Sequence, residues 1–367
     1  CMHSVLDEFY AHIAEEAGSF QLAETLGAGR DDQGLETLLL QLEAKVQSHA
    51  YPQRWIVRQE EFWEKMCSET GLTFETTVYG QEIFSAAKTS LAHWRQLLEN
   101  TQALLRGHSL LEERYLPGFE SLTELLREME QCPQWDRLAA LLQLEMPKLR
   151  PVKDVDGGEE KQHAQAIWKG CKDMLGRLRE DFSIPQQQMQ QDLCAMAPAM
   201  LALMKLLRNF LDACRQEKLR RDVMDFSDQE HGAIQLLYAE DGKPTALAQR
   251  LSRRYAEVLV DEYQDSNEVQ NYIFRAVSGE GRRLFAVGDV KQSIYRFRLA
   301  DPTIFLRDYQ SYADYTKAEA GEPRKITLSK NFRSREEVLS ATNFVFENIL
   351  SREMGELDYG PEERLYC

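Results

Sequence analysis

A short apolar run that ends in two carboxylates, Val258–Asp265 (VLVDEYQD), constrains the fold of this chain more than any other stretch. Such short runs of β-branched and aliphatic residues are typical of strands buried on both faces of a parallel sheet. Ligands of open α/β sheets bind beyond the carboxyl ends of the strands, where Asp261 and Glu262 would lie. One carboxylate could hold Mg²⁺ while its neighbour faces an attacking water, because adjacent side chains point to opposite sides. For this pair alone, a solvated strand end is the simpler interpretation.

A second block repeats the pattern. Leu284–Val287 is predicted to be a strand and Gly288-Asp289 its exit turn. Gln292 would then lie where a neutral amide can contact a terminal phosphate. Aromatic and basic side chains alternate just beyond it, which suits stacking on unpaired bases beside a phosphate backbone: Tyr295, Arg296, Phe297 and Arg298. The alternative is that the two aromatic residues belong to the core at the start of a helix.

A third block, Leu328–Arg335 (LSKNFRSR), follows a predicted strand at Lys325–Leu328. An arginine at a strand exit, here Arg333, could reach a γ-phosphate and stabilise the charge that develops on it. The alternative is a surface arginine in a basic turn.

Together the three blocks resemble superfamily 1 DNA helicases of the UvrD/PcrA/RecB kind. In that family DE[FY]QD is motif II, VGDxxQSIYxFR is motif III and LxxN[FY]RS is motif IV. The wording VGDVKQSIYRFRLADP, from Val287 to Pro302, is most similar to the A subunits of AddAB (RexAB) helicase–nucleases. Asp225–Asp228 (DFSD) also matches a DFxD block of the family, and it could in addition cap a helix. The close resemblance covers roughly residues 215–345.

The resemblance implies ATP as substrate, Mg²⁺ as cofactor, and single- and double-stranded DNA as ligands. In such a protein Asp261 would bind Mg²⁺, Glu262 would activate water, and Gln292 and Arg333 would read the γ-phosphate. The remaining implied site residues are Gln264 and Asp265 for ATP and Mg²⁺, and Tyr295, Phe297 and Arg298 for single-stranded DNA.

The implied fold is α/β: part of a P-loop NTPase (RecA-like) parallel sheet that carries a large all-α inserted subdomain. Residues 1–220 would form the helical insert, 221–325 the later part of the first motor domain, and 326–367 motif IV with the start of the second. Apolar periodicity predicts helices at 33–50, 54–70, 81–106, 119–130, 135–145, 161–182, 192–219 and 335–350. The last of these is expected to turn six side chains inward: Val338, Leu339, Ala341, Phe344, Val345 and Ile349.

Composition narrows the class of protein. The net charge of −16 and pI near 5.1 argue against a protein that coats DNA, which would be basic overall. Basic residues nevertheless gather locally, around 215–221, at Arg282-Arg283, at 291–298 and at 330–335. The seven cysteines are scattered without a CxxC pair, which predicts reduced thiols in a cytoplasmic protein. No apolar run approaches the roughly 20 residues of a membrane span.

The sequence contains no G-x-x-x-x-G-K-[ST] phosphate-binding loop. The nearest match, Gly242–Thr245, lacks the upstream glycine and has a proline where a donor is needed. Together with the initial Cys1, this predicts an internal fragment of a longer protein that does not hydrolyse ATP by itself. The resemblance implies a parent that acts in double-strand-break repair and recombination, has exonuclease activity and pairs with a B-type subunit.

Two other interpretations remain open. The chain could be a helicase-like scaffold without turnover that binds DNA or a partner subunit; the missing loop favours this, whereas intact Asp261, Glu262, Gln292 and Arg333 oppose it. Alternatively, residues 1–220 could be a helical protein-interaction module.

Overall fold

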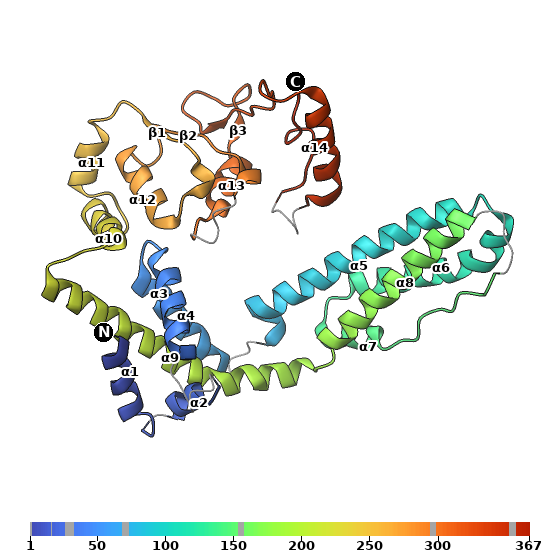
Figure 1. The fold of residues 1–367 in the computed structure, drawn as a ribbon, viewed down its shortest axis with the longest axis horizontal. Helices are drawn as coiled ribbons and strands as arrows, with labels where there is room; N and C mark the ends of the chain where they lie inside the picture. The colour runs from blue at the N-terminus through green and yellow to red at the C-terminus, as the bar shows by residue number, and fades with distance from the viewer. Residues whose placement is uncertain are drawn as a thin grey trace. The chain divides into compact units, whose positions relative to one another are not determined.

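The computed structural model describes residues 2–15, 17–25, 33–67, 73–152, 158–293, 299–351 and 357–367. Two compact units divide the chain: unit 1 comprises Cys1–Leu6, Asp31–Val57 and Leu207–Cys367, and unit 2 comprises Asp7–Arg30 and Arg58–Leu206. Three helices carry the chain from one unit into the other: α1 (Met2–Ala11), α4 (Pro52–Cys67) and α9 (Gln186–Arg221). All strands of the described residues lie in unit 1, so the chain is a mainly helical α/β protein (Figure 1).

Unit 2 is built on α5 (Val78–Leu105), α6 (Ser109–Gln131) and α8 (Gly158–Asp181), which run alongside one another (Figure 1). Thr77 caps α5, because its side chain accepts a hydrogen bond from Gly80 N at 3.1 Å. The shorter elements of this unit are α2 (Ala17–Thr25), η1 (Phe74–Thr76) and α7 (Trp135–Leu142).

The core of unit 2 is a continuous apolar cluster contributed by η1 and α5–α8. At one end of it, the ring of Trp135 is fully buried, with its centroid 4.1 Å from that of Phe182 and 5.1 Å from that of Phe74. Its Nε1 donates to the carbonyl oxygen of Ile184 at 3.2 Å, so the one polar group of the indole is satisfied. Burial of this face, repeated at helical spacing along α5 and α6, is what holds these helices together.

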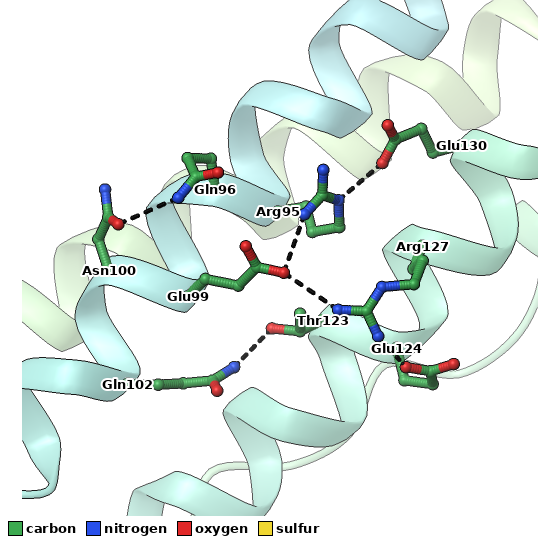
Figure 2. A network of polar contacts seen from close by, with 9 residues as sticks. All are labelled: Arg95, Gln96, Glu99, Asn100, Gln102, Thr123, Glu124, Arg127 and Glu130. Atoms are coloured by element: carbon green, nitrogen blue, oxygen red, sulfur yellow. Dashed lines mark hydrogen bonds and ion pairs between the residues drawn. The ribbon is translucent and has the colours of Figure 1, made fainter.

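The partly exposed seam between α5 and α6 carries a network of charged side chains (Figure 2). Oε1 of Glu99 lies 2.9 Å from Nη1 of Arg95 and 3.1 Å from Nη2 of Arg127. Arg95 also donates through Nε to Glu130 at 2.7 Å. Each of the two arginines binds one carboxylate on its own helix and one on the other helix. The network therefore fixes the register of the two helices more than it adds to their stability.

Unit 1 contains a small parallel sheet formed by β1 (Val258–Val260) and β2 (Leu284–Ala286), with Val258 opposite Leu284 and Val260 opposite Ala286. Parallel neighbours need a crossover, which here consists of η2 (Tyr263–Asp265) and α12 (Glu268–Val277). Helices α10 (Phe226–Leu237) and α11 (Ala246–Ser252) pack against α12, and their shared core also takes in Ala50, just beyond α3 (Gln33–Gln47).

Beyond β2 the chain forms η3 (Val290–Gln292), α13 (Pro302–Ser311), a second parallel pair of β3 (Ala313–Asp314) with β4 (Arg324–Lys325), and α14 (Glu336–Ile349). Asn343 of α14 is buried and binds the final residues: its amide donates to Leu365 O at 2.9 Å and accepts from Leu365 N at 3.0 Å. The hydroxyl of Tyr359 donates to the same Asn343 oxygen at 2.8 Å. A buried amide that meets several partners anchors the C-terminal segment on α14.

The strand that precedes Asp261 was expected to be buried on both faces of the sheet, and this expectation is wrong. Leu259 is 70% exposed and Phe285 is 54% exposed, whereas Val258 and Val260 are half-buried. Side chains alternate across a strand, so one face of the β1–β2 pair is partly covered and the described residues leave the other face open.

Three further expectations are corrected. The strand predicted at Lys325–Leu328 extends only over Arg324–Lys325. The separate helix at 119–130 belongs to α6, which begins at Ser109 and continues through Pro117 because its apolar face is unbroken there. In α14, Leu339 is buried but Val338, Ala341, Phe344, Val345 and Ile349 are exposed, since the described residues offer that helix one narrow contact face. The other predicted helices are confirmed to within several residues at their ends.

One helix qualifies the expectation that no segment resembles a membrane span. By length and composition alone, α9 is apolar enough to cross a membrane, and 44% of its most apolar window is buried in the structure. Core helices of soluble proteins meet the same criterion, so this helix assigns no membrane location.

Neighbouring positions on α5 separate the contribution of the core from that of the charged seam. We expect Leu98→Ala, at a fully buried site, to lower the free energy of unfolding by about 2–5 kcal/mol. Glu99→Ala, which removes the centre of the charged network, should cost about 1 kcal/mol or less. Urea unfolding monitored by tryptophan fluorescence measures the free energy of unfolding of unit 2, because this unit contains Trp63, Trp94, Trp135 and Trp168. A larger loss for Glu99→Ala than for Leu98→Ala would contradict it.

Candidate functional site

The carboxyl ends of β1 and β2 lie side by side, and the first two sequence blocks meet there. Val287 N donates to Val260 O at 2.8 Å and Tyr263 N donates to Val287 O at 2.9 Å, so the pairing continues past the last residue of each strand. Parallel pairing therefore brings Asp261 and Glu262 to the same edge of the sheet as Gly288 and Asp289. This edge is where ligands of open α/β sheets bind.

Glu262 turns the chain out of β1 with left-handed backbone angles, φ 49° and ψ 44°. A residue with a Cβ in this region costs of order 1 kcal/mol, and such residues gather at functional sites. The turn leads directly into η2, whose Tyr263 is buried and donates its hydroxyl proton to Asn271 Oδ1 at 2.6 Å. Burial raises the pKa of Tyr263 to about 12, so this residue is a neutral structural anchor under the exposed carboxylates.

A chain of hydrogen bonds joins two of the predicted catalytic residues. The amide of Gln264 donates to Glu262 Oε2 at 2.7 Å, and its Oε1 accepts from the backbone nitrogen of Asp289 at 3.0 Å. Asp289 Oδ2 in turn accepts from Nε2 of Gln292 at 3.1 Å. Gln264 is buried, so its side chain has few alternatives to this bridging position.

Gly288 makes this bridge possible. A Cβ atom at position 288 would lie 2.5 Å from Gln264 Oε1 and 3.3 Å from the backbone nitrogens of Tyr263 and Gln264. A side chain therefore cannot fit there unless Gln264 moves. The sequence predicts only an exit turn at Gly288, and no pattern in it indicates which side chain the glycine faces.

Asp289 holds the second half of the edge. Burial acts to raise the pKa of its carboxyl, but hydrogen bonds from Lys291 and Gln292 and the positive charge of Lys291 lower that pKa below its ordinary value. Lys291 Nζ lies 2.8 Å from Asp289 Oδ1. Asp289 is thus ionised at neutral pH, and it also caps η3 by accepting from Lys291 N. The sequence pattern did not predict this role, although the place of Asp289 just after the strand was visible.

The exposed Asp261 suits a metal ligand. One of its oxygens accepts from Glu262 N at 2.9 Å, which orients the carboxylate and leaves the other oxygen available. The Oδ1 atom of Asp265 is buried without a hydrogen-bond partner among the described residues. No group of three or more potential metal-ligating side chains occurs in the described ranges. The carboxylates of Asp261 and Asp265 fit Mg²⁺, which is commonly held by one or two carboxylates together with waters and substrate phosphates.

Arg333 lies apart from this network. Its side chain is exposed, and no hydrogen bond or ion pair joins it to Glu262 or Gln292 in the part of the chain that the structure describes. Asn331 Oδ1 accepts from the backbone nitrogens of Arg333 and Ser334 at 2.9 Å each, so the turn itself is well defined. Tyr366 pairs with this segment through Asn331 N and Ser329 O.

Tyr295, Phe297 and Arg298, the predicted DNA-binding residues, lie outside the described residues. The chain after them is bonded to the residue that follows the first block, because Asp301 N donates to Ser266 O at 2.9 Å. Asp301 also caps α13 through Thr303 N at 3.0 Å.

The Asp225–Asp228 block caps a helix, which confirms one of the two roles expected for it. Asp225 accepts from Asp228 N and Asp228 accepts from Asp225 N, both at 2.9 Å, which forms a capping box at the start of α10. Lys218 reaches both carboxylates, at 2.5 Å and 2.9 Å. Part of the basic group at 215–221 is therefore already neutralised within unit 1.

Comparison with known proteins agrees with the three blocks. Residues 159–313 match the UvrD/REP helicase N-terminal domain, a range that includes the first two blocks and ends before the third. The chain is 36% identical, over 99% of its length, to the A subunit of an ATP-dependent helicase/nuclease from Acetivibrio thermocellus. The corresponding A subunits from Ruminiclostridium cellulolyticum and Bacillus thuringiensis are each 32% identical over 99% of the chain.

The chain spans about 30% of the length of each of these relatives. Residues 159–313 are thus similar to the UvrD/REP helicase N-terminal domain, and over nearly its whole length the chain is similar to the A subunits of ATP-dependent helicase/nucleases.

Proposed function

We propose that these residues form the motif II to motif IV part of an ATP-driven motor that translocates on single-stranded DNA. The observation that carries the proposal is the hydrogen-bond chain from Glu262 through Gln264 and Asp289 to Gln292. It gives a surface carboxylate and a neutral amide a fixed relation at the ligand-binding edge of a parallel sheet. In this reading 1–220 is the helical insert, 221–325 belongs to a RecA-like first motor domain, and 326–367 begins the second.

At this edge Glu262 orients and deprotonates the attacking water. Its carboxylate is held at Oε2 by Gln264, which leaves Oε1 to accept a proton, and the left-handed turn keeps it at the end of β1. Asp261 and the nearby Asp265 would hold Mg²⁺, which neutralises charge on the phosphates when bound. Gln292, already hydrogen-bonded to Asp289, would contact the γ-phosphate with its remaining amide atoms.

Arg333 would complete the site by moving toward the γ-phosphate. Its exposed side chain is available for this, and the turn that carries it is fixed by Asn331. The coupling to DNA would run through Tyr295, Phe297 and Arg298, because the residues after them are bonded to Ser266, one position beyond the first block. We place the whole protein in the cytoplasm, in double-strand-break repair and recombination, with exonuclease activity and a B-type partner subunit.

The role of Glu262 is tested in a version lengthened to the extent of the relatives, so that it includes a phosphate-binding loop. Glu262→Gln should reduce DNA-stimulated ATP hydrolysis by at least about 100-fold, since it removes the base but keeps the shape and the bond from Gln264. Nucleotide binding should be unchanged. The 367 residues alone should hydrolyse no ATP, and turnover in that chain that Glu262→Gln removes would refute this part of the proposal.

The bridge is tested by Gly288→Ala, whose Cβ would displace Gln264 from Asp289. In the 367-residue chain, the backbone amide of Asp289 should exchange with solvent about tenfold faster, because it loses its hydrogen bond. In the lengthened version ATP hydrolysis should fall by about tenfold or more. Gly232→Ala is the matched control, because nothing lies within 4 Å of a Cβ at that position of α10. Equal exchange at Asp289 in both variants would rule out the bridge.

DNA binding separates the motor from a scaffold without turnover. Phe297→Ala should weaken binding of single-stranded DNA by about tenfold, the loss expected for one stacked base, as measured by fluorescence anisotropy. Tyr315→Ala, an exposed aromatic outside the three blocks, should leave affinity unchanged. If the lengthened version hydrolyses no ATP but its DNA binding still depends on Phe297, the scaffold is favoured. If Phe297→Ala leaves DNA affinity unchanged, Phe297 is not part of the DNA site.

A further inference from the structure

A pocket of unit 1 lies at the opposite end of the strands from Asp261 and Glu262. It has a volume of about 310 Å³ and sits between the end of α11, the end of α12 and the loop that leads into β2. Three of its lining residues are arginines: Arg253, Arg282 and Arg283. Because Arg282 and Arg283 immediately precede β2, the pocket is at the amino-terminal edge of the parallel pair.

Two of these arginines approach one point. A Cβ atom built on Gly279 would lie 3.1 Å from Nη2 of Arg283 and 3.7 Å from Nη2 of Arg282. Like charges brought this close repel one another unless an anion lies between them. Gly279 has a φ of 73°, so both the space and the backbone favour glycine there.

Within the described ranges, the protein does not neutralise the three guanidinium groups. No carboxylate there forms an ion pair with Arg253, Arg282 or Arg283, in contrast to Arg220 and Arg221, which both bind Glu217 at 2.5 Å. The one carboxylate among the residues that line the pocket, Glu280, accepts a hydrogen bond from the hydroxyl of Tyr238 at 3.2 Å. The pocket thus has a net positive charge in a chain of net charge −16.

The loop beneath the pocket has an unusual backbone. Gly279, Glu280 and Gly281 follow one another with φ angles of 73°, 62° and 84°. The amides of Glu280 and Gly281 are already engaged, by Arg275 O at 2.7 Å and by Ser278 Oγ at 3.1 Å. These amides are therefore not available to a ligand, and recognition would depend on the arginine side chains.

We propose that this pocket binds a phosphate group. Arginine presents several donors in a planar fork, so two guanidinium groups can share one tetrahedral oxyanion through paired hydrogen bonds. A phosphate carries more charge and more acceptor oxygens than a single carboxylate, which favours it where three cations converge. The phosphate belongs either to a nucleic-acid backbone or to a small free phosphate. The site is distinct from the motif edge, since a strand separates them.

The test is a calorimetric titration of the 367-residue chain with inorganic pyrophosphate. The double variant Arg282→Gln, Arg283→Gln should bind pyrophosphate at least about tenfold more weakly, since each charged hydrogen bond lost is worth that factor or more. The control, Arg250→Gln with Arg254→Gln, removes the same charge from exposed arginines that do not line the pocket, and should bind within about twofold of the parent. Arg282→Lys should still bind pyrophosphate more weakly than the parent, because lysine keeps the charge but lacks the planar fork of donors.

A second titration, with a single-stranded oligonucleotide at low salt, identifies the source. Loss of oligonucleotide affinity in the Arg282, Arg283 variant but not in the control assigns the site to a nucleic-acid backbone. Loss confined to pyrophosphate assigns it to a free phosphate, and either result supports the proposal. Three results overturn it: no pyrophosphate binding by the parent chain, equal weakening in the control, or displacement of pyrophosphate by an oligoglutamate peptide at comparable concentration, which would mark a surface for an acidic protein partner.

Discussion

The side chain of Gln264 links the ends of two neighbouring strands, and the candidate site depends on it. Its amide fixes the carboxylate of Glu262 while its oxygen fixes the chain at Asp289. That arrangement requires burial of Gln264, a left-handed turn at Glu262 and the absence of a side chain at Gly288. Three local features that are each unfavourable or restrictive thus serve one bridge, which is the usual circumstance in which strain persists in a folded protein.

The two units rely on different forces. Unit 2 is held by a long apolar seam between helices, with charged residues confined to its partly exposed margin. In unit 1, the apolar core shared by α10, α11 and α12 is accompanied by buried polar side chains that meet several partners, such as Asn343 and Gln264. Buried amides of this kind specify one arrangement, because any other would leave them without partners.

Charge is distributed unevenly along the chain. Lys218, Arg220 and Arg221 bind carboxylates of their own unit, and Lys291 binds Asp289. Arg253, Arg282 and Arg283 instead converge on an open pocket. An acidic protein can contact phosphates when its unpaired cations gather in one place, because screening limits the repulsion from distant carboxylates to about 10 Å.

Local patterns in the sequence are sufficient to locate the individual elements and the order of the three blocks. Apolar periodicity located α5 and α8, and the run before Asp261 located β1, because these signals depend only on neighbouring residues. Long-range folding brings particular side chains together: Gln264 with Gly288, the arginines at Gly279, and Asn343 with the last residues. It also leaves Leu259 and most apolar residues of α14 exposed, where the pattern predicted burial. Burial and pairing depend on residues far apart in the chain, so a local pattern cannot specify them.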